Sequence, residues 1–272
     1  MAKTILIYQM GKVGSRSIQQ GLFHCQFAQA NSIDEILRCD GHVVAHSHSH
    51  ERSAAIIDHP IHATGKRELI VVSLVRELIG RTISAMFQNI DNVGHPLAIG
   101  ERAYVLSLTV EEIIAAFRER QGHHLEGEVI PWFDTFSKNV GLDVFAFPFP
   151  TERGFRTYRS RKAKIAILRT ENVSQAEQWL ERVFGLSLFI FGHANSTAER
   201  WQGQSYRDFC AGFRPTSAEL DAYYDTKIMR HFYTAAEIAA FRAKWSRPIT
   251  TPQKPSPRTP PQPCVSARTR PP

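Results

Sequence analysis

The feature that most constrains the fold is a near-continuous apolar run, Leu-Ile-Val-Val-Ser-Leu-Val, at residues 69–75. A strand with one face in water alternates apolar and polar side chains, whereas a strand covered on both faces is apolar throughout. Residues 4–8 and 163–169 are similar runs, and helical periodicity follows each of the three. The sequence therefore predicts an α/β protein: a central, mainly parallel sheet flanked by helices, with a helical C-terminal part over residues 195–245.

One further strand pair is expected beyond these runs. Residues 141–150 are apolar but contain two prolines, which have no N–H to donate, so they predict an irregular edge strand. Residues 154–158 are expected to pair with it.

The charge and proline content divide the chain into two parts. Residues 247–272 hold nine of the fifteen prolines and five cations without an acid, which predicts a Pro-rich, basic, disordered tail. Subtracting these five charges from the net +7 leaves +2 for residues 1–246, which we expect to form one domain. So small a surplus does not favour a nucleic-acid partner.

The remaining composition favours a cytoplasmic protein without an integral membrane segment. No apolar run approaches the ~18 residues that span a bilayer, and the N-terminus lacks a signal-peptide pattern. The four cysteines show no C-x-x-C spacing, which argues against a zinc knuckle or a disulfide framework. The sequence does not indicate an oligomeric state.

The first strand runs into a loop suited to an anion. Residues 11–17, Gly-Lys-Val-Gly-Ser-Arg-Ser, join the strand 4–8 to a helical pattern. Two glycines permit positive φ angles, Lys12 adds a charge, and the helix start adds amides and the positive end of its dipole. A Walker A loop ends in Gly-Lys-Ser/Thr, whereas here the lysine precedes the second glycine. The alternative is an ordinary glycine turn.

A histidine cluster follows the next apolar segment. His46, His48 and His50 alternate, so they would share one face if the strand continued. Three interpretations stay open: a zinc site, a structural or solvent-exposed run, or a general base at a strand end. No carboxylate pair or cysteine accompanies the cluster, and we expect no metal.

The apolar run 69–75 ends at Arg76, with Ser84 eight residues later in a helical pattern. Parallel strands of open α/β folds bind ligands at their carboxyl ends, which is where Arg76 is expected. Taken alone, the pair is better explained by a surface arginine and a tolerated helix serine.

Both motifs together resemble the signatures of the sulfotransferase superfamily. Residues 12–17 resemble the Lys-x-Gly-Thr/Ser-x-Ser/Thr loop that grips the 5′-phosphosulfate of 3′-phosphoadenosine 5′-phosphosulfate (PAPS), and residues 72–87 resemble the segment that binds its 3′-phosphate. The chain is most similar to a bacterial family of capsular polysaccharide synthesis proteins. That family shares the Gln-Met-Gly-Lys-Val-Gly-Ser start and the run at 76–89, where Met86 replaces a commoner aromatic. The resemblance covers most of residues 4–245.

This resemblance implies a three-layer P-loop-like fold and a PAPS-dependent enzyme that sulfates a hydroxyl of a carbohydrate or small acceptor, in capsular or surface polysaccharide synthesis. The implied donor-binding residues are Lys12, Val13, Gly14, Ser15, Arg16, Ser17, Arg76 and Ser84. Lys12 is also the implied catalytic charge on the leaving oxygen.

The resemblance leaves the general base less defined. Cytosolic sulfotransferases end the intervening strand in Lys-Thr-His, and matching strand ends places His46-Ser-His48 there. His48 is therefore the expected base and His46 the second candidate, although some related enzymes use a glutamate. Two other functions stay open: a P-loop nucleotide kinase or nucleotidase, and a non-catalytic nucleotide- or glycan-binding protein of polysaccharide assembly.

Four other features receive weaker assignments. We expect His123-His124 to lie in a polar loop without a special role, and Glu171 to be structural. The aromatic cluster at residues 131–136 is core or an acceptor-side wall. Lys227 and Arg230 either reach the ligand or are surface charges.

Overall fold

The computed structural model describes residues 1–191 and 201–247. The expected tail, apart from Arg247, and residues 195–200 of the expected helical part lie outside the described residues.

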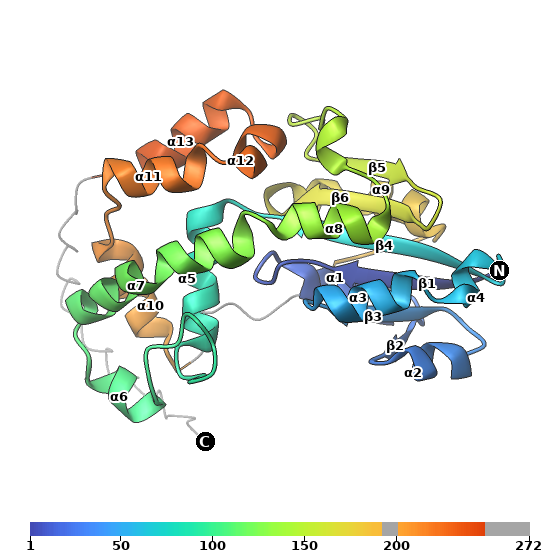
Figure 1. The fold of residues 1–272 in the computed structure, drawn as a ribbon, viewed down its shortest axis with the longest axis horizontal. Helices are drawn as coiled ribbons and strands as arrows, with labels where there is room; N and C mark the ends of the chain where they lie inside the picture. Colours follow the sequence, from blue (N-terminus) through green and yellow to red (C-terminus); the bar gives the residue numbers. More distant parts are fainter. Residues whose placement is uncertain (192–200, 248–272) are drawn as a thin grey trace, which may run out of the picture.

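Within the described chain, six strands form one sheet in the order β2-β3-β1-β4-β6-β5. All neighbours are parallel except β5 and β6, which are antiparallel. β4 lies between β1 and β6 inside the sheet, and helices cover both faces of the sheet (Figure 1). It is therefore buried at every position except Glu68. The α/β class, the mainly parallel sheet and the helical C-terminal part are therefore confirmed.

The N-terminal half alternates strands and helices up to α5 (Figure 1). Its elements are β1 (Ala2–Tyr8), α1 (Ser15–His24), β2 (Ala28–Ala30), α2 (Ile33–Arg38), β3 (Val43–Ser47), α3 (His50–Ile57), α4 (Pro60–Ala63), β4 (Arg67–Val75) and α5 (Leu78–Asn89). Helices α6 (Arg102–Ser107) and α7 (Val110–His124) follow, then the π-helical turn η1 (Leu125–Val129) and α8 (Trp132–Val140).

The second half completes the sheet and adds the C-terminal helices. Its elements are the 3₁₀ turn η2 (Val144–Ala146), β5 (Phe155–Arg159), β6 (Lys164–Arg169), the 3₁₀ turn η3 (Thr170–Gln175), α9 (Glu177–Phe184), α10 (Gly203–Gly212), α11 (Ser217–Tyr224), α12 (Lys227–Phe232) and α13 (Ala235–Trp245).

The expected edge strand at 141–150 is wrong. The carboxylate of Asp143 accepts a hydrogen bond from the amide of Phe145 and caps the turn η2. Two prolines follow, so the segment has too few donors for a ladder. β5 instead pairs with β6, placing Phe155 opposite Leu168.

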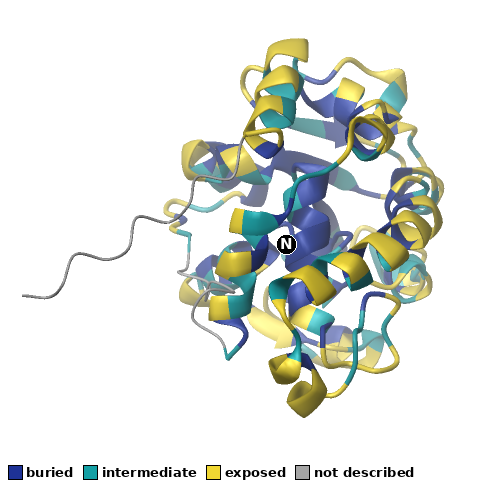
Figure 2. Cartoon of the chain, turned by 90° about the vertical axis from the view of Figure 1, so that its left-hand side faces the viewer, coloured by how far each residue is buried: buried dark blue, intermediate teal, exposed yellow. Residues whose placement is uncertain are grey.

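The sheet forms the centre of the buried core, with exposed residues on the outer faces of the helices (Figure 2). Two carboxylates attach the C-terminal helices to it. Glu77 accepts from the hydroxyl of Tyr224 at 2.6 Å, and Glu171 accepts from the hydroxyl of Tyr233 and the amide of Glu77, each at 3.0 Å. The structural assignment of Glu171 agrees with these contacts.

The parallel strands bring their carboxyl ends to one edge of the sheet. β1 and β3 pair from Thr4 with Val43 to Tyr8 with Ser47, so the loop after β1 begins beside the segment that follows β3. β4 pairs with β1 on its other side, and Val75 lies opposite Arg169 of β6. The sequence-predicted motifs therefore meet at this edge.

Candidate functional site

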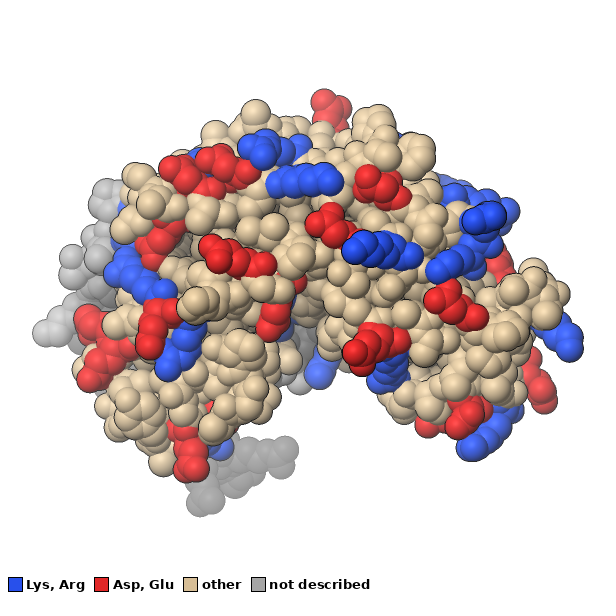
Figure 3. Space-filling model, in the orientation of Figure 1, with Lys and Arg blue, Asp and Glu red and all other residues tan. Residues whose placement is uncertain are grey.

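A cavity of about 1120 Å³ opens at the carboxyl edge of the sheet. Its lining comes from the β1–α1 loop, the end of β3, α5, η1 and α8. The molecule is hollowed between the parts that carry α6 and α2, and charges of both signs are mixed over the face in view (Figure 3). The predicted site residues that line the cavity are Lys12, Gly14, Ser15, Arg16, Ser17, His46, His48, Arg76 and Ser84.

The β1–α1 loop has an unusual backbone held by specific contacts. Gly11, Lys12 and Gly14 have φ angles of 78°, 59° and 82°, and a positive φ is rare for a lysine. Arg76 donates to the carbonyl of Lys12 at 3.0 Å. Thr170, at the end of β6, donates to the carbonyl of Val13 at 2.6 Å. Neighbouring strand ends therefore impose the loop conformation.

Val13 differs from the other predicted contact residues. Its side chain is fully buried in the hydrophobic core, and it does not line the cavity. Its side chain therefore anchors the loop to the core and is not available to a ligand.

The start of α1 has unpaired backbone amides. No side chain caps it, and its first turn has no acidic residue. Among the described residues, none accepts a hydrogen bond from the amides of Gly14, Ser15 or Arg16. By contrast, the carboxylate of Glu77 accepts from two amides at the start of α5 and so occupies that helix end. The unsatisfied amides and helix dipole of α1 favour an anion there.

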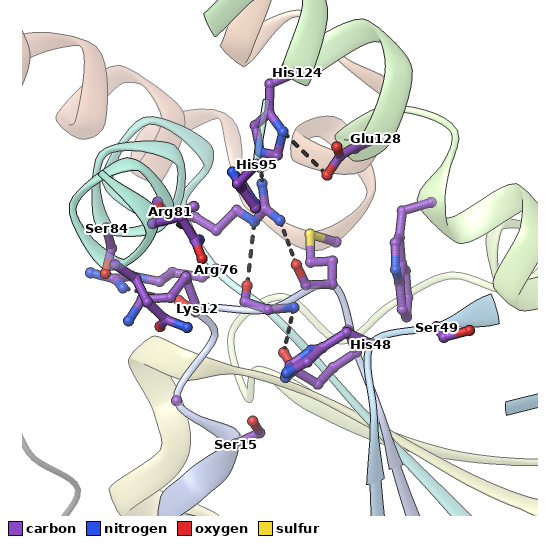
Figure 4. A pocket seen from close by; sticks show the side chains of 18 of the residues that line it. Lys12, Ser15, His48, Ser49, Arg76, Arg81, Ser84, His95, His124 and Glu128 are labelled. Atoms are coloured by element: carbon purple, nitrogen blue, oxygen red, sulfur yellow. Dashed lines mark hydrogen bonds and ion pairs between the residues drawn. The ribbon is translucent and has the colours of Figure 1, made fainter. Parts of the chain in front are cut away.

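Arg76 and Ser84 lie near this loop. Arg76 follows β4, while Ser84 is on the second turn of α5 and is almost fully buried at the cavity wall. In the view of Figure 4, Arg76 and Ser84 lie on the side of Lys12, and His48 lies on the opposite side of the loop. The cavity thus has a second cationic, hydrogen-bonding position beyond the loop.

Gln9 connects the loop to two of the three histidines. Its side-chain Nε2 lies 3.2 Å from His46 Nε2 and 3.0 Å from His48 Nδ1, and its Oε1 accepts from the amide of Gly11 at 2.9 Å. The two imidazole rings meet edge to face, 4.7 Å apart. Sequence reasoning did not identify Gln9, although it lies in the quoted Gln-Met-Gly-Lys motif.

The two histidines differ in their environment. Burial, together with neighbouring His48, lowers the pKa of His46 to about 4, so this ring is neutral at pH 7. Burial also lowers the pKa of His48, partly opposed by a hydrogen bond to the Gln9 carbonyl. His48 is nevertheless exposed toward the cavity, whereas His46 is mostly covered and its Nε2 lies 3.0 Å from Ser15 Oγ.

His50 departs from the other two because β3 ends at Ser47 and α3 begins at His50. Its Nδ1 is hydrogen bonded to the hydroxyl of Tyr8, and its ring lies 5.5 Å from that of Trp132. Residues 1–191 and 201–247 contain no group of three or more His, Cys, Asp or Glu that could hold a metal ion.

The expectation for His123-His124 is wrong. α7 continues to His124, which is buried and lines the cavity. His124 Nε2 lies 2.8 Å from Nη1 of Arg81, and its Nδ1 lies 3.2 Å from a carboxylate oxygen of Glu128 (Figure 4). The i, i+4 spacing of histidine and glutamate was the available signal, but the polar composition around His123-His124 hid the continuation of the helix.

The other weak assignments resolve as follows. Trp132 is buried yet lines the cavity, while Phe133 and Phe136 are core residues. Lys227 and Arg230 do not line the cavity; Lys227 Nζ lies over the ring of Phe145, 4.0 Å from its centre. No helix in the described part of the chain is long and apolar enough to cross a membrane.

Comparison with known proteins adds one structural match. The sequence matches no family model and no curated protein. Among solved structures, a sulfotransferase from Alicyclobacillus acidocaldarius matches with a TM-score of 0.41 and 10% sequence identity, over 86% of this chain and 98% of that chain.

Proposed function

We propose that the chain is a cytoplasmic sulfotransferase that moves a sulfuryl group from PAPS to a hydroxyl of a carbohydrate or small acceptor, in capsular or surface polysaccharide synthesis. Residues 1–246 would form its catalytic domain. One observation carries the proposal. The open start of α1 with Lys12, and the pair Arg76 and Ser84, line the same cavity. A nucleotide with anionic groups at both its 5′ and 3′ positions fits two such positions better than a triphosphate does.

The loop residues supply the electrostatics of this reaction. Bound PAPS would supply an activated sulfuryl group whose transfer, like phosphoryl transfer, depends on alignment and on stabilising the charge that develops. The amides of residues 14–16 and the hydroxyls of Ser15 and Ser17 would hold the 5′ group. Lys12 would neutralise the leaving oxygen, while Arg76 and Ser84 would hold the 3′-phosphate.

His48 is the better candidate for the general base. Its Nδ1 lies 3.1 Å from the carbonyl oxygen and 3.0 Å from the side-chain Nε2 of Gln9. In the tautomer whose Nδ1 donates to the carbonyl, Nε2 is the basic nitrogen of the neutral ring. His48 also faces the open cavity. The Nε2 of His46 is already close to Ser15 Oγ and Gln9 Nε2, so His46 is better suited to positioning Ser15.

The opposite wall favours an uncharged acceptor. The cavity exceeds the ~1,000 Å³ upper range of a typical small-molecule pocket, which leaves room for a second substrate beside a nucleotide. We assign to that wall the lining residues Glu51, Glu128, Thr135 and Trp132. Carboxylates accept hydrogen bonds from sugar hydroxyls, and a hydroxyl both accepts and donates them, whereas the two carboxylates repel an anionic acceptor.

Calorimetry with 3′-phosphoadenosine 5′-phosphate (PAP), ADP and ATP tests the donor assignment. We expect PAP to bind most tightly and Arg76→Ala to reduce this preference over ADP by about tenfold, the value of one lost charge-assisted contact. Tighter binding of ATP than PAP contradicts the proposal, and Mg²⁺-dependent ATP turnover would indicate a kinase or nucleotidase instead.

Transfer itself is tested with PAPS labelled in its sulfur and a panel of neutral, amino and acidic oligosaccharides and phenols. We expect label in a neutral acceptor. Binding of PAP without transfer to any acceptor would instead support a non-catalytic nucleotide- or glycan-binding protein.

A further inference from the structure

Arg81 is a buried arginine that the proposed chemistry does not use. It lies on the first turns of α5 and is only 3% exposed. Its Nε donates to the carbonyl of Gly11 at 3.3 Å, and its Nη2 donates to the carbonyl of Met10. The guanidinium therefore holds two successive carbonyls at the point where the loop leaves β1.

This contact matters because of the loop's backbone. Gly11 and Lys12 both have positive φ angles, a conformation that costs an L residue such as Lys12 about 1–2 kcal/mol. A loop that binds an anion must also keep its carbonyl oxygens away from the ligand, since they repel it. Arg81 satisfies two of those oxygens, and Arg76 satisfies the next one, on Lys12.

Arg81 is held in turn by two residues from another part of the chain. A guanidinium only donates, so the Nε2 of His124 accepts from Arg81, and the proton of the neutral ring is on Nδ1. That Nδ1 lies 3.2 Å from the carboxylate of Glu128, close enough for an electrostatic contact but outside hydrogen-bond geometry. Glu128 lies in the π-helical turn η1, and its side chain is 49% exposed at the cavity wall.

We propose that Arg81 is the positioning residue of the donor loop, and that Glu128 orients it through His124. We call these three residues the Arg81 relay. The relay fixes the positive-φ segment before a ligand arrives and connects the acceptor wall to the donor loop. The identity of the ligand rests on the proposed function, but the positioning of the loop does not.

The chain offers a matched control for Arg81. Arg67 is also buried, at 4% exposure, and also holds two carbonyls, those of Lys3 and Cys39. It lies at the start of β4, at the opposite end of the strand from the cavity. Arg67→Lys therefore measures the general cost of losing a buried guanidinium, without touching the loop.

The first measurement is hydrogen–deuterium exchange of the ligand-free protein over residues 9–18. We expect Arg81→Lys to raise the exchange rate of the hydrogen-bonded amides in this segment, those of Gln9, Gly11 and Ser17, by about tenfold, which corresponds to one lost hydrogen bond of loop stability. Arg67→Lys should leave it within about twofold, whatever its effect on melting temperature. Equal exchange in the two variants would overturn the proposal.

The second measurement is the affinity for PAP by calorimetry. Arg81→Lys should weaken binding by about tenfold and Glu128→Gln by about threefold, because removal of the Glu128 charge loosens the relay at its far end. Glu126→Gln, an exposed change in the same turn, should leave the affinity unchanged. Equal affinities for the Glu128 and Glu126 variants would overturn the role of Glu128.

The two measurements separate the proposals. If the wild-type protein does not bind PAP, the donor assignment fails, but hydrogen exchange of the loop in Arg81→Lys still tests the Arg81 relay. If Arg81→Lys does not fold, hydrogen exchange of the loop in Glu128→Gln provides this test.

Discussion

Replacing Gly14 by alanine tests the loop conformation and the anion site together. Gly14 has a φ angle of 82°, where an L residue costs about 1–2 kcal/mol. A Cβ at this position would also lie 3.3 Å from Cγ2 of Thr170. Thr170 cannot easily yield, because its hydroxyl donates to the carbonyls of Val13 and Val75. We expect Gly14→Ala to lower the free energy of unfolding by about 2–3 kcal/mol.

Gly65→Ala is the matched control. Gly65 has a φ angle of 69°, but no atom lies within 4 Å of a Cβ placed there, and it is outside the cavity lining. Gly65→Ala should therefore lower the free energy of unfolding only by the cost of the positive φ angle, about 1–2 kcal/mol. The melting temperature should fall by about 2–4 °C for each kcal/mol. These changes are measured by thermal and urea unfolding.

Ligand binding completes this test. A Cβ on Gly14 displaces the amides at the start of α1, so the affinity for PAP should fall by about tenfold or more in Gly14→Ala. The affinity should be unchanged in Gly65→Ala. If the two variants are equally stable and bind PAP equally, the strained loop is not the anion site.

Three further predictions concern the histidines and the C-terminal helices. His48→Gln should reduce sulfuryl transfer by about 10²–10⁴-fold and leave the affinity for PAP within about twofold; undiminished transfer excludes His48 as the base. Burial lowers the pKa of His48, so in the wild type the rate measured against pH should stay constant from pH 8 down to its usual 6.5 and fall only below that value. The pKa of His46 falls from its usual 6.5 to about 4 in the folded protein, so the unfolded chain binds the proton more readily. Stability is then full above pH 6.5 and declines by up to about 3 kcal/mol toward pH 4, and urea unfolding of His46→Gln should show a shallower decline. Glu77→Ala removes a buried carboxylate that accepts from two amides and from Tyr224, and should cost about 3 kcal/mol. Tyr224→Phe should cost about 1 kcal/mol in the same urea assay, and equal losses would contradict this account.

Local composition was sufficient for much of the fold. The apolar runs ending at Tyr8, Val75 and Arg169 became β1, β4 and β6, because a segment without alternation can only be buried on both faces. Prediction failed at residues 141–150, where a side-chain cap and prolines outweighed the apolar content. It also failed at His124, whose polar neighbours suggested a loop where the last turn of α7 buries one histidine against Arg81.

The candidate site, like the fold, was only partly predictable from the sequence. Chain order placed Lys12, Arg76 and His48 after successive strands, and parallel pairing alone is enough to bring such positions to one edge of a sheet. No local signal distinguished His48 from His46, since that difference depends on which ring the fold leaves open to the cavity.

The sequence by itself determined the buried central strands, the glycine loop and the cations near it, because strand burial and positive φ angles depend on the residues of each segment. Only the tertiary structure decided how the loop is held. Gln9, Arg81 and Glu128 are separated by 119 positions from first to last, and no periodic pattern links them. Gln9 and Arg81 satisfy polar groups of one buried loop, and Glu128 lies beside His124, which contacts Arg81. Such pairing follows from three-dimensional packing rather than from order along the chain.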